Sequence, residues 1–161
     1  MRVLPYLFYL ILIAIHVVIL QDLTAVYAAT INLPALIVLL VAVYKDDVPA
    51  TWFGFFAGLT AAAGLPFGLG WHALVMAALA LAVWYVRQRL NLESLGARLL
   101  LVVGGVLLHN VATLVIVRAD SFVTLLWASA LTGAVYTTIF AWLFFLAREG
   151  RVTYQKIRAL F

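Results

Sequence analysis

Long hydrophobic runs separated by short polar segments make up almost the whole chain. An apolar run of about 20 residues is long enough to cross the hydrocarbon core of a bilayer as a helix. The pattern therefore predicts an all-α integral membrane protein, a six-transmembrane-helix bundle forming a single membrane domain. The predicted spans are residues 3–20, 25–44, 50–65, 71–86, 99–117 and 122–146.

The first two runs each carry a feature that needs interpretation. Small residues at 26–28 are typical of a signal-peptide cleavage site, but the first run is longer than the usual apolar region of about 7–15 residues. We therefore interpret it as a retained first helix. Pro34 lies in the second run and lacks a backbone N–H, so we expect it to kink that helix.

Composition supports the membrane assignment. Hydrophobic residues make up 68% of the 161 positions and charged residues only 10%, whereas soluble domains have about 45–50% and about 25%. The length leaves room for one bundle and for no separate soluble domain of useful size. The chain contains no cysteine, which excludes a disulfide framework, a thiolate metal site and thiol redox chemistry.

The net charge of +4 is distributed along the chain in a way that predicts its orientation. If both termini face the cytoplasm, only Arg118 of the ten Lys and Arg residues lies in an outer segment. An excess of Lys and Arg on the cytoplasmic side is the usual orientation signal. The other nine are Arg2, Lys45, Arg87, Arg89, Arg98, Arg148, Arg151, Lys156 and Arg158.

The basic tail, residues 147–161, has two readings. Ordinary positive flanking of the last span is the one that we favour, and an amphipathic segment lying on an anionic leaflet is the other. The tail offers no folded basic surface, so we expect no nucleic-acid partner.

The predicted spans contain no Asp, Glu, Lys or Arg, which argues against ion-coupled transport, pumping and voltage sensing. Three histidines lie on different predicted helices without ligand spacing, so we expect hydrogen-bonded core residues rather than a metal site. Ser129 could face His109, but no strained turn surrounds it as a nucleophile would need. We expect no catalytic residues, no cofactor and no enzyme activity. The polar residues within the spans include His16, Asn32, His72, His109 and Asn110.

Two groups of small residues interrupt the large apolar side chains. Gly54 and Gly58 stand four positions apart and share one helix face, which Ala62 helps to widen. Ser129 and Gly133 have the same spacing in the last run. Small residues let helix backbones approach closely in a bilayer. Both groups are therefore predicted to be helix-packing faces or partner interfaces.

The first small-residue group also belongs to a longer pattern. The run Gly54-Phe55-x-x-Gly58-Leu59 precedes a glycine-bearing turn and then Gly70-x-His72-Ala73-Leu74. This pattern resembles the rod shape-determining protein family MreD, and a proline-bearing second helix and a basic segment after the fourth run fit it too. That family often carries an acidic residue at the position of Ala62. This chain has no carboxylate there and cannot perform whatever role that group has in relatives.

The resemblance implies a non-enzymatic scaffold in the bacterial cytoplasmic membrane, part of the cell-elongation machinery that builds peptidoglycan. Such a scaffold associates with the single-span protein MreC, and through it with the cytoskeletal filament and the cell-wall synthases. The family is similar in fold to the substrate-binding subunits of energy-coupling-factor transporters. The alternative is therefore a vitamin-binding membrane subunit, with Asn32, His72 and residues 66–70 around a pocket on the outer side.

Overall fold

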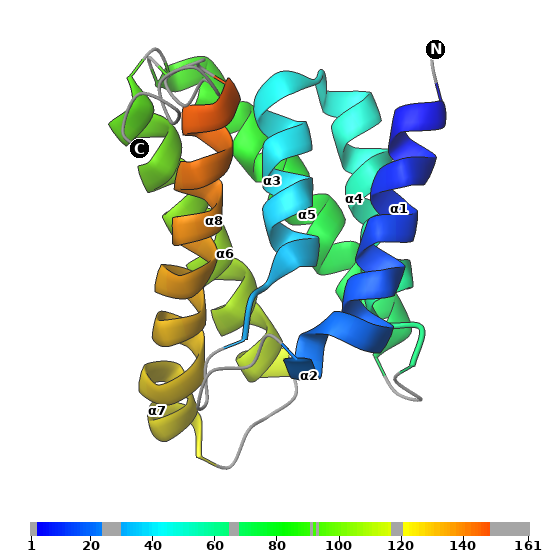
Figure 1. The fold of residues 1–161 in the computed structure, drawn as a ribbon, viewed down its shortest axis with the longest axis vertical. Coiled ribbons are helices and arrows are strands. Elements are labelled where there is room, and N and C mark those ends of the chain that lie inside the picture. Colours follow the sequence, from blue (N-terminus) through cyan, green and yellow to red (C-terminus); the bar gives the residue numbers. More distant parts are fainter. Residues whose placement is uncertain are drawn as a thin grey trace, which may run out of the picture.

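The computed structural model describes residues 3–23, 30–64, 68–90, 92, 94–116 and 121–148. All regular structure in these residues is helical and forms six rods packed side by side (Figure 1). This confirms the predicted all-α class. The first rod joins α1 (Leu4–Ile15), the π-helix η1 (His16–Leu20) and α2 (Gln21–Leu23). The next four rods are single helices: α3 (Leu33–Tyr44), α4 (Asp47–Ala61), α5 (Leu69–Arg89) and α6 (Leu95–Ile116). The last rod joins α7 (Phe122–Leu125), the π-helix η2 (Leu126–Leu131) and α8 (Thr132–Arg148).

Three of the rods are long and apolar enough to cross a membrane: Leu69–Arg89, Leu95–Ile116 and Phe122–Arg148. At about 1.5 Å per residue, each spans the roughly 30 Å of a hydrocarbon core. Leu4–Leu20 and Leu33–Tyr44 are shorter apolar helices. The structure is therefore compatible with a membrane protein by the length and composition of these helices. Six crossings with cytoplasmic termini stay a prediction.

The start of α3 corrects the predicted second span. Residues 30–32 are not helical, and the helix begins at Leu33 rather than near residue 25. Asn32 caps it, because the Asn32 Oδ1 accepts a hydrogen bond from the Ala35 N–H at 3.1 Å. Pro34 lies in the first turn, where its missing N–H would have no partner within the helix. The expected kink at Pro34 is therefore wrong.

Other boundaries differ from the predicted spans by a few residues. Helix α4 runs from 47 to 61 rather than from 50 to 65, whereas α5 and α6 extend beyond their apolar runs into flanking arginines. Backbone hydrogen bonding continues through such residues because their long side chains reach away from the apolar region. The cleavage-site-like residues 26–28 and the basic tail beyond Arg148 lie outside the described residues.

Helix α3 is the centre of the bundle. Nine of its 12 residues are buried, and it contacts α1, α4, α5, α6 and α8. A helix that is apolar on all sides is typical of such a fully surrounded position. Arg87 of α5 closes its C-terminal end, where the Nη1 group donates to the carbonyl oxygens of Val43 at 2.7 Å and Ala42 at 3.3 Å.

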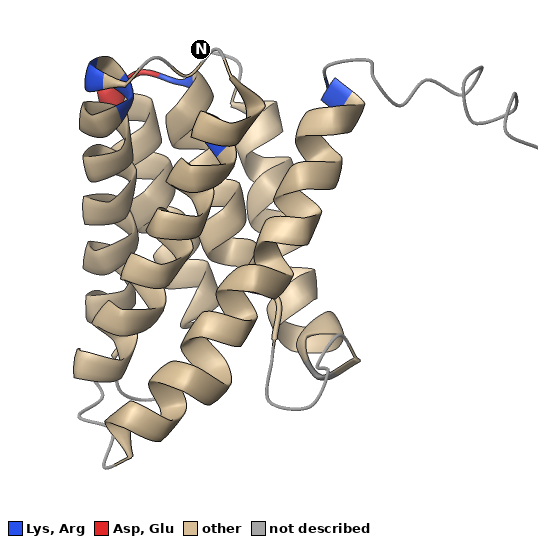
Figure 2. Cartoon of the chain, turned by 90° about the vertical axis from the view of Figure 1, so that its left-hand side faces the viewer, with Lys and Arg blue, Asp and Glu red and all other residues tan. Residues whose placement is uncertain are grey.

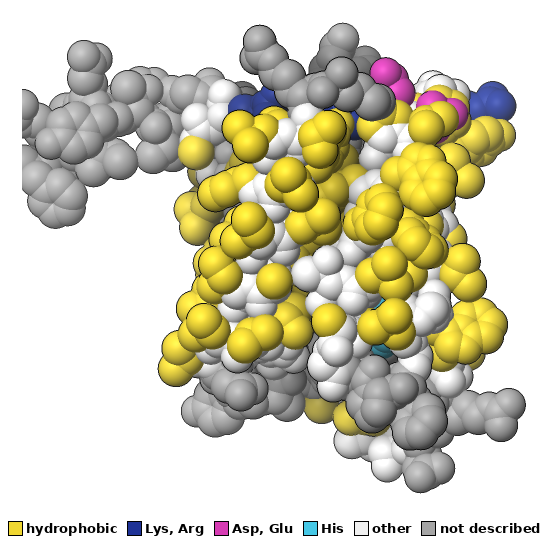
Figure 3. All heavy atoms as spheres, turned by 90° about the vertical axis from the view of Figure 1, so that its right-hand side faces the viewer, with side chains coloured by type: hydrophobic (Ala, Val, Ile, Leu, Met, Phe, Trp, Pro, Cys, Tyr) yellow, Lys and Arg dark blue, Asp and Glu magenta, His cyan; other side chains and the backbone are white. Residues whose placement is uncertain are grey.

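The Lys and Arg residues that the structure describes gather at one end of the bundle, where α1 begins and α8 ends (Figures 1 and 2). Hydrophobic side chains cover much of the side of the bundle that Figure 3 shows. Val18 is 81% exposed, Leu4 78% and Leu100 72%. Apolar surface on this scale is unfavourable in water, so these sides suit contact with lipid.

Candidate functional site

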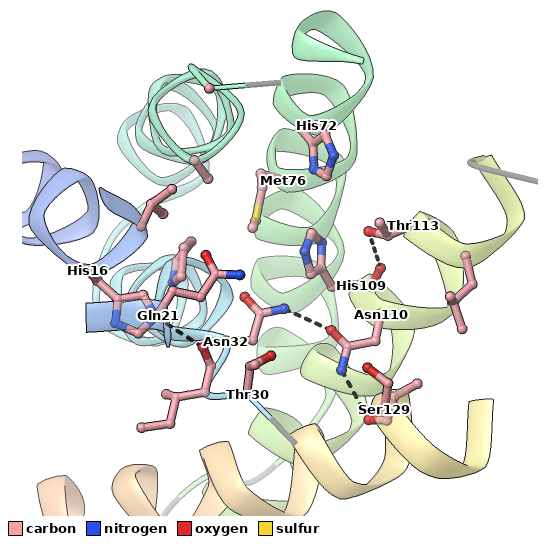
Figure 4. Close-up of a pocket in the computed structure, with 17 residues that line it drawn as sticks. His16, Gln21, Thr30, Asn32, His72, Met76, His109, Asn110, Thr113 and Ser129 are labelled. Carbon is pink, nitrogen blue, oxygen red and sulfur yellow. Dashed lines mark hydrogen bonds between the residues drawn. The ribbon is translucent and has the colours of Figure 1, made fainter. Parts of the chain in front are cut away.

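A pocket of about 410 Å³ lies between the helices, in the half of the bundle away from the charged end (Figure 4). Its volume falls within the range of about 300–1,000 Å³ that is usual for small-molecule sites. The elements around it are η1, the start of α3, the ends of α4 and α6, the start of α5, and η2. The polar lining residues are His16, Gln21, Thr30, Asn32, His72, His109, Asn110, Thr113 and Ser129.

Two asparagines tie together the elements around the pocket. The Asn32 Nδ2 donates to the Asn110 Oδ1 at 2.8 Å, and the Asn110 Nδ2 donates to the Ala130 carbonyl at 3.1 Å. The Asn32 N–H donates to the Thr137 Oγ1 at 2.9 Å. This network joins α3, α6, η2 and α8, so both amide side chains are engaged in holding the helices.

Both π-helices contribute to the pocket wall. His16 and Val17 come from η1, and Ser129 and Ala130 come from η2. A π-helical stretch interrupts the regular hydrogen-bond ladder of an α-helix and often occurs at functional sites. Here the Ala130 carbonyl accepts from Asn110, and the His16 Nε2 bonds the Ile31 carbonyl at 3.1 Å.

The three histidines converge on this one pocket, which their places on separate predicted helices did not suggest. His72 and His109 lie next to each other, with ring centroids 6.5 Å apart. Among the described residues, no group of three His, Cys, Asp or Glu side chains could hold a metal ion. The expectation of a core histidine with a hydrogen-bonding ring fits His16.

His109 departs from that expectation. Its side chain is 6% exposed, and its Nδ1 atom has no hydrogen-bond partner in the described structure. The reason lies in the helix geometry, since neighbouring residues of a helix point about 100° apart. Asn110 points toward α3 and η2, whereas His109 lies beside His72 of α5. The prediction of a satisfied core histidine is therefore wrong at the Nδ1 atom of His109.

The first small-residue group packs α4 against α5. A Cβ atom at Gly54 would lie 2.6 Å from the Met76 carbonyl oxygen, and one at Gly58 would lie 2.5 Å from that of His72. Such distances leave no room for a side chain. Ala62, at the end of α4, is fully buried. Of the two predicted roles, this face serves packing within the chain.

The second small-residue group is also internal. Gly133 is buried, and a Cβ atom there would lie 3.1 Å from the carbonyl oxygen of Thr30. Ser129, one turn earlier, lines the pocket. The last rod thus supports the extended segment before α3.

The sequence identified Asn32 and His72 as pocket residues under the transporter alternative, and both line this pocket. Sequence reasoning did not find Gln21, Thr30 or Thr113. One sequence signal could have found them. Successive helices cross a bilayer in alternating directions, and the polar residues of the successive runs then fall at similar depths in the bundle. No family model, curated protein or solved structure matches the chain.

Proposed function

We propose that this protein is a non-catalytic membrane scaffold of the MreD type, working in the bacterial cytoplasmic membrane. In this role it binds a single-span partner of the MreC type. Through that partner it connects the cytoskeletal filament with the synthases that build peptidoglycan during cell elongation.

The observation that carries the proposal is that the residues of the family resemblance meet in space. Gly58 lies against the backbone of His72 and Ala73, and Gly54 lies against that of Met76. The two halves of the pattern, around 54–59 and around 70–74, are therefore one helix–helix contact. This contact requires glycine at both positions for a steric reason, so the resemblance rests on a structural unit rather than on apolar composition alone.

The sides of the bundle suit a scaffold. Trp52, Leu100 and Trp127 expose 58%, 72% and 67% of their surface on α4, α6 and η2. In a bilayer, helices associate through close packing and hydrogen bonds rather than through the hydrophobic effect. A partner's single helix would therefore dock on one of these sides, since both glycine faces are occupied by other segments of the chain itself.

A second candidate is the vitamin-binding subunit of an energy-coupling-factor transporter. The pocket favours it, because Asn32 and His72 line a space of small-molecule size in the half away from the charged end. This function also requires docking on energising ATPase subunits.

Purification from the native membrane in mild detergent, followed by mass spectrometry, tests the proposal. We expect a single-span protein with a large extracytoplasmic domain to be recovered with the tagged chain. ATPase subunits carrying a bound vitamin would instead establish the transporter role. A photo-crosslinking residue placed at 52, 100 or 127 in turn should capture the partner from one side of the bundle, and the two silent positions serve as matched controls.

A further inference from the structure

We propose that the pocket between η1, α5 and α6 binds a small, uncharged organic molecule, with the Nδ1 atom of His109 as its anchoring group. The inference rests on the pocket and not on the scaffold role, and it holds for either candidate function. The sequence pointed to Asn32 and His72 for such a site, whereas the structure shifts the weight to His109.

His109 carries the argument because it is both buried and unpaired. About nine in ten buried polar groups in proteins have a hydrogen-bond partner. The His109 Nδ1 has none among the described atoms, although the ring is 6% exposed and lines the pocket. A molecule in the pocket that offers one hydrogen-bonding group would satisfy this atom.

The chemistry of the wall defines the class of molecule. The described lining residues supply imidazole, amide and hydroxyl groups, and none of them is Asp, Glu, Lys or Arg. An ion buried here would meet no opposite charge among the described lining residues to compensate its lost hydration. Val17, Pro34 and Met76 add apolar wall. The pocket therefore suits an apolar body, such as an aromatic ring, that carries a neutral polar group.

The two asparagines shape the pocket rather than hold its contents. The Asn32 Oδ1 accepts from Ala35, and its Nδ2 donates to Asn110, whose own Nδ2 donates to Ala130. Replacing Asn32 would therefore loosen the helices around the site, and a loss of binding in that variant would not identify a contact. His109 is the position that separates binding from folding.

Met76 provides a direct reporter of occupancy. It lines the pocket, is 1% exposed and is one of two methionines in the chain. We would label the methionine methyl groups with ¹³C in the full-length protein in detergent and follow the Met76 signal by NMR. The probes are nicotinamide and benzamide, each compared with its charged counterpart, nicotinate or benzoate.

We expect the neutral probes to shift the Met76 signal in a saturable way, and the charged counterparts to bind at least about tenfold more weakly. The variant His109→Phe keeps a ring of similar shape and removes the unpaired atom. It should lose the response while melting at or above the wild-type temperature. Tyr136→Phe, a change outside the pocket lining, should leave the response unchanged.

Two results would overturn the proposal. One is a Met76 signal that does not shift when the neutral probes are added, which would mean that the pocket holds only water. The other is a response to the charged probes that equals the neutral one, a comparison made on the wild-type protein and independent of how any variant folds. An unchanged response in His109→Phe would remove His109 as the anchor.

Discussion

Single polar side chains hold α3 in place at both of its ends. At the charged end, Arg87 bonds the last carbonyls of the helix at 2.7 and 3.3 Å. The final carbonyls of a helix have no partner within it and carry the negative end of its dipole, so a cation there is doubly favourable. Arg148 adds a second contact by stacking over the Tyr44 ring, with its guanidinium carbon 3.8 Å from the centroid.

Replacing Arg87 with Gln should therefore lower the free energy of unfolding by about 1.5–3 kcal/mol, the range for hydrogen bonds to charged groups. Arg89→Gln is the matched control, because the contacts that Arg89 makes with described residues are to exposed Tyr85: a weak 3.3 Å hydrogen bond to the hydroxyl and a cation–π contact with the ring. That control should lose less than about 1 kcal/mol. Thermal unfolding of both variants in one detergent checks the prediction, and equal losses would contradict it.

At the other end of α3, Asn110 bridges Asn32 and the Ala130 carbonyl. Asn110→Leu leaves two part-buried groups, the Asn32 amide and the Ala130 carbonyl, without this partner. We expect the free energy of unfolding to fall by about 1–2 kcal/mol, a value between the average of about 0.6 for one interhelical bond in a membrane and the larger penalty of unpaired groups. Thr138→Val removes only a bond to the carbonyl one turn back in its own helix and should change little. A smaller loss in Asn110→Leu than in this control would show that the bridge contributes nothing to stability.

At the scale of elements, the crossing of α4 on α5 brings the backbones of two helices into close contact. Gly58→Ala should separate these helices, because the added Cβ would meet backbone atoms of His72 and Ala73 at 2.5 and 2.6 Å, and backbone cannot move aside as a side chain can. We expect a loss of at least about 2 kcal/mol, typical of overpacking. Gly104→Ala, where nothing lies within 4 Å, should instead stabilise by up to about 1 kcal/mol through helix propensity.

Melting temperatures of the two alanine variants, measured in the same detergent, should therefore shift in opposite directions. A fall of the melting temperature in both variants would mean that helix propensity and steric fit do not determine the effect of alanine at these two positions. Gly58→Leu adds a larger side chain at the same contact, and we expect it to disrupt the chain's own fold.

The sequence predicted the elements better than their limits. The hydrophobic runs identified the rods because each apolar stretch must be buried or face lipid. The break at residues 30–32 was missed because Ile31 and Leu33 continue the apolar run, although Asn32 and Pro34 together form an ordinary helix-start signal. The pocket could be predicted only in part. Which faces of separate helices converge depends on packing, as the contrast between His109 and Asn110 shows.

At the scale of the molecule, α3 shows how a short helix can fit a membrane-sized bundle. Its 12 residues rise only about 18 Å, and residues 30–32 continue the path as non-helical backbone. Irregular backbone at membrane depth is tolerated where protein groups satisfy it. His16 bonds Ile31, and Thr137 accepts from Asn32, so polar residues inside the bundle make the non-helical segment possible and create the pocket beside it.

Orientation is the remaining property of the whole molecule that the charge distribution predicts. The charged end should face the cytoplasm, which places the pocket near the outer side. Because the chain has no cysteine, single cysteines can be introduced without background. Asp46→Cys marks the charged end, and Gly64→Cys and Ser121→Cys mark the opposite end; all three positions are exposed, and the Asp46 and Ser121 side chains make no capping hydrogen bond.

A membrane-impermeant maleimide added to intact spheroplasts should label the cysteines at 64 and 121, and should label the one at 46 only after permeabilisation. Labelling of 46 first would invert the orientation and move the pocket to the cytoplasmic side, while leaving the fold unchanged. Labelling of only one of the two outer positions would show that the number of crossings differs from six. The three positions together therefore test direction and crossing number separately, because 64 and 121 end or begin different rods at the same end of the bundle.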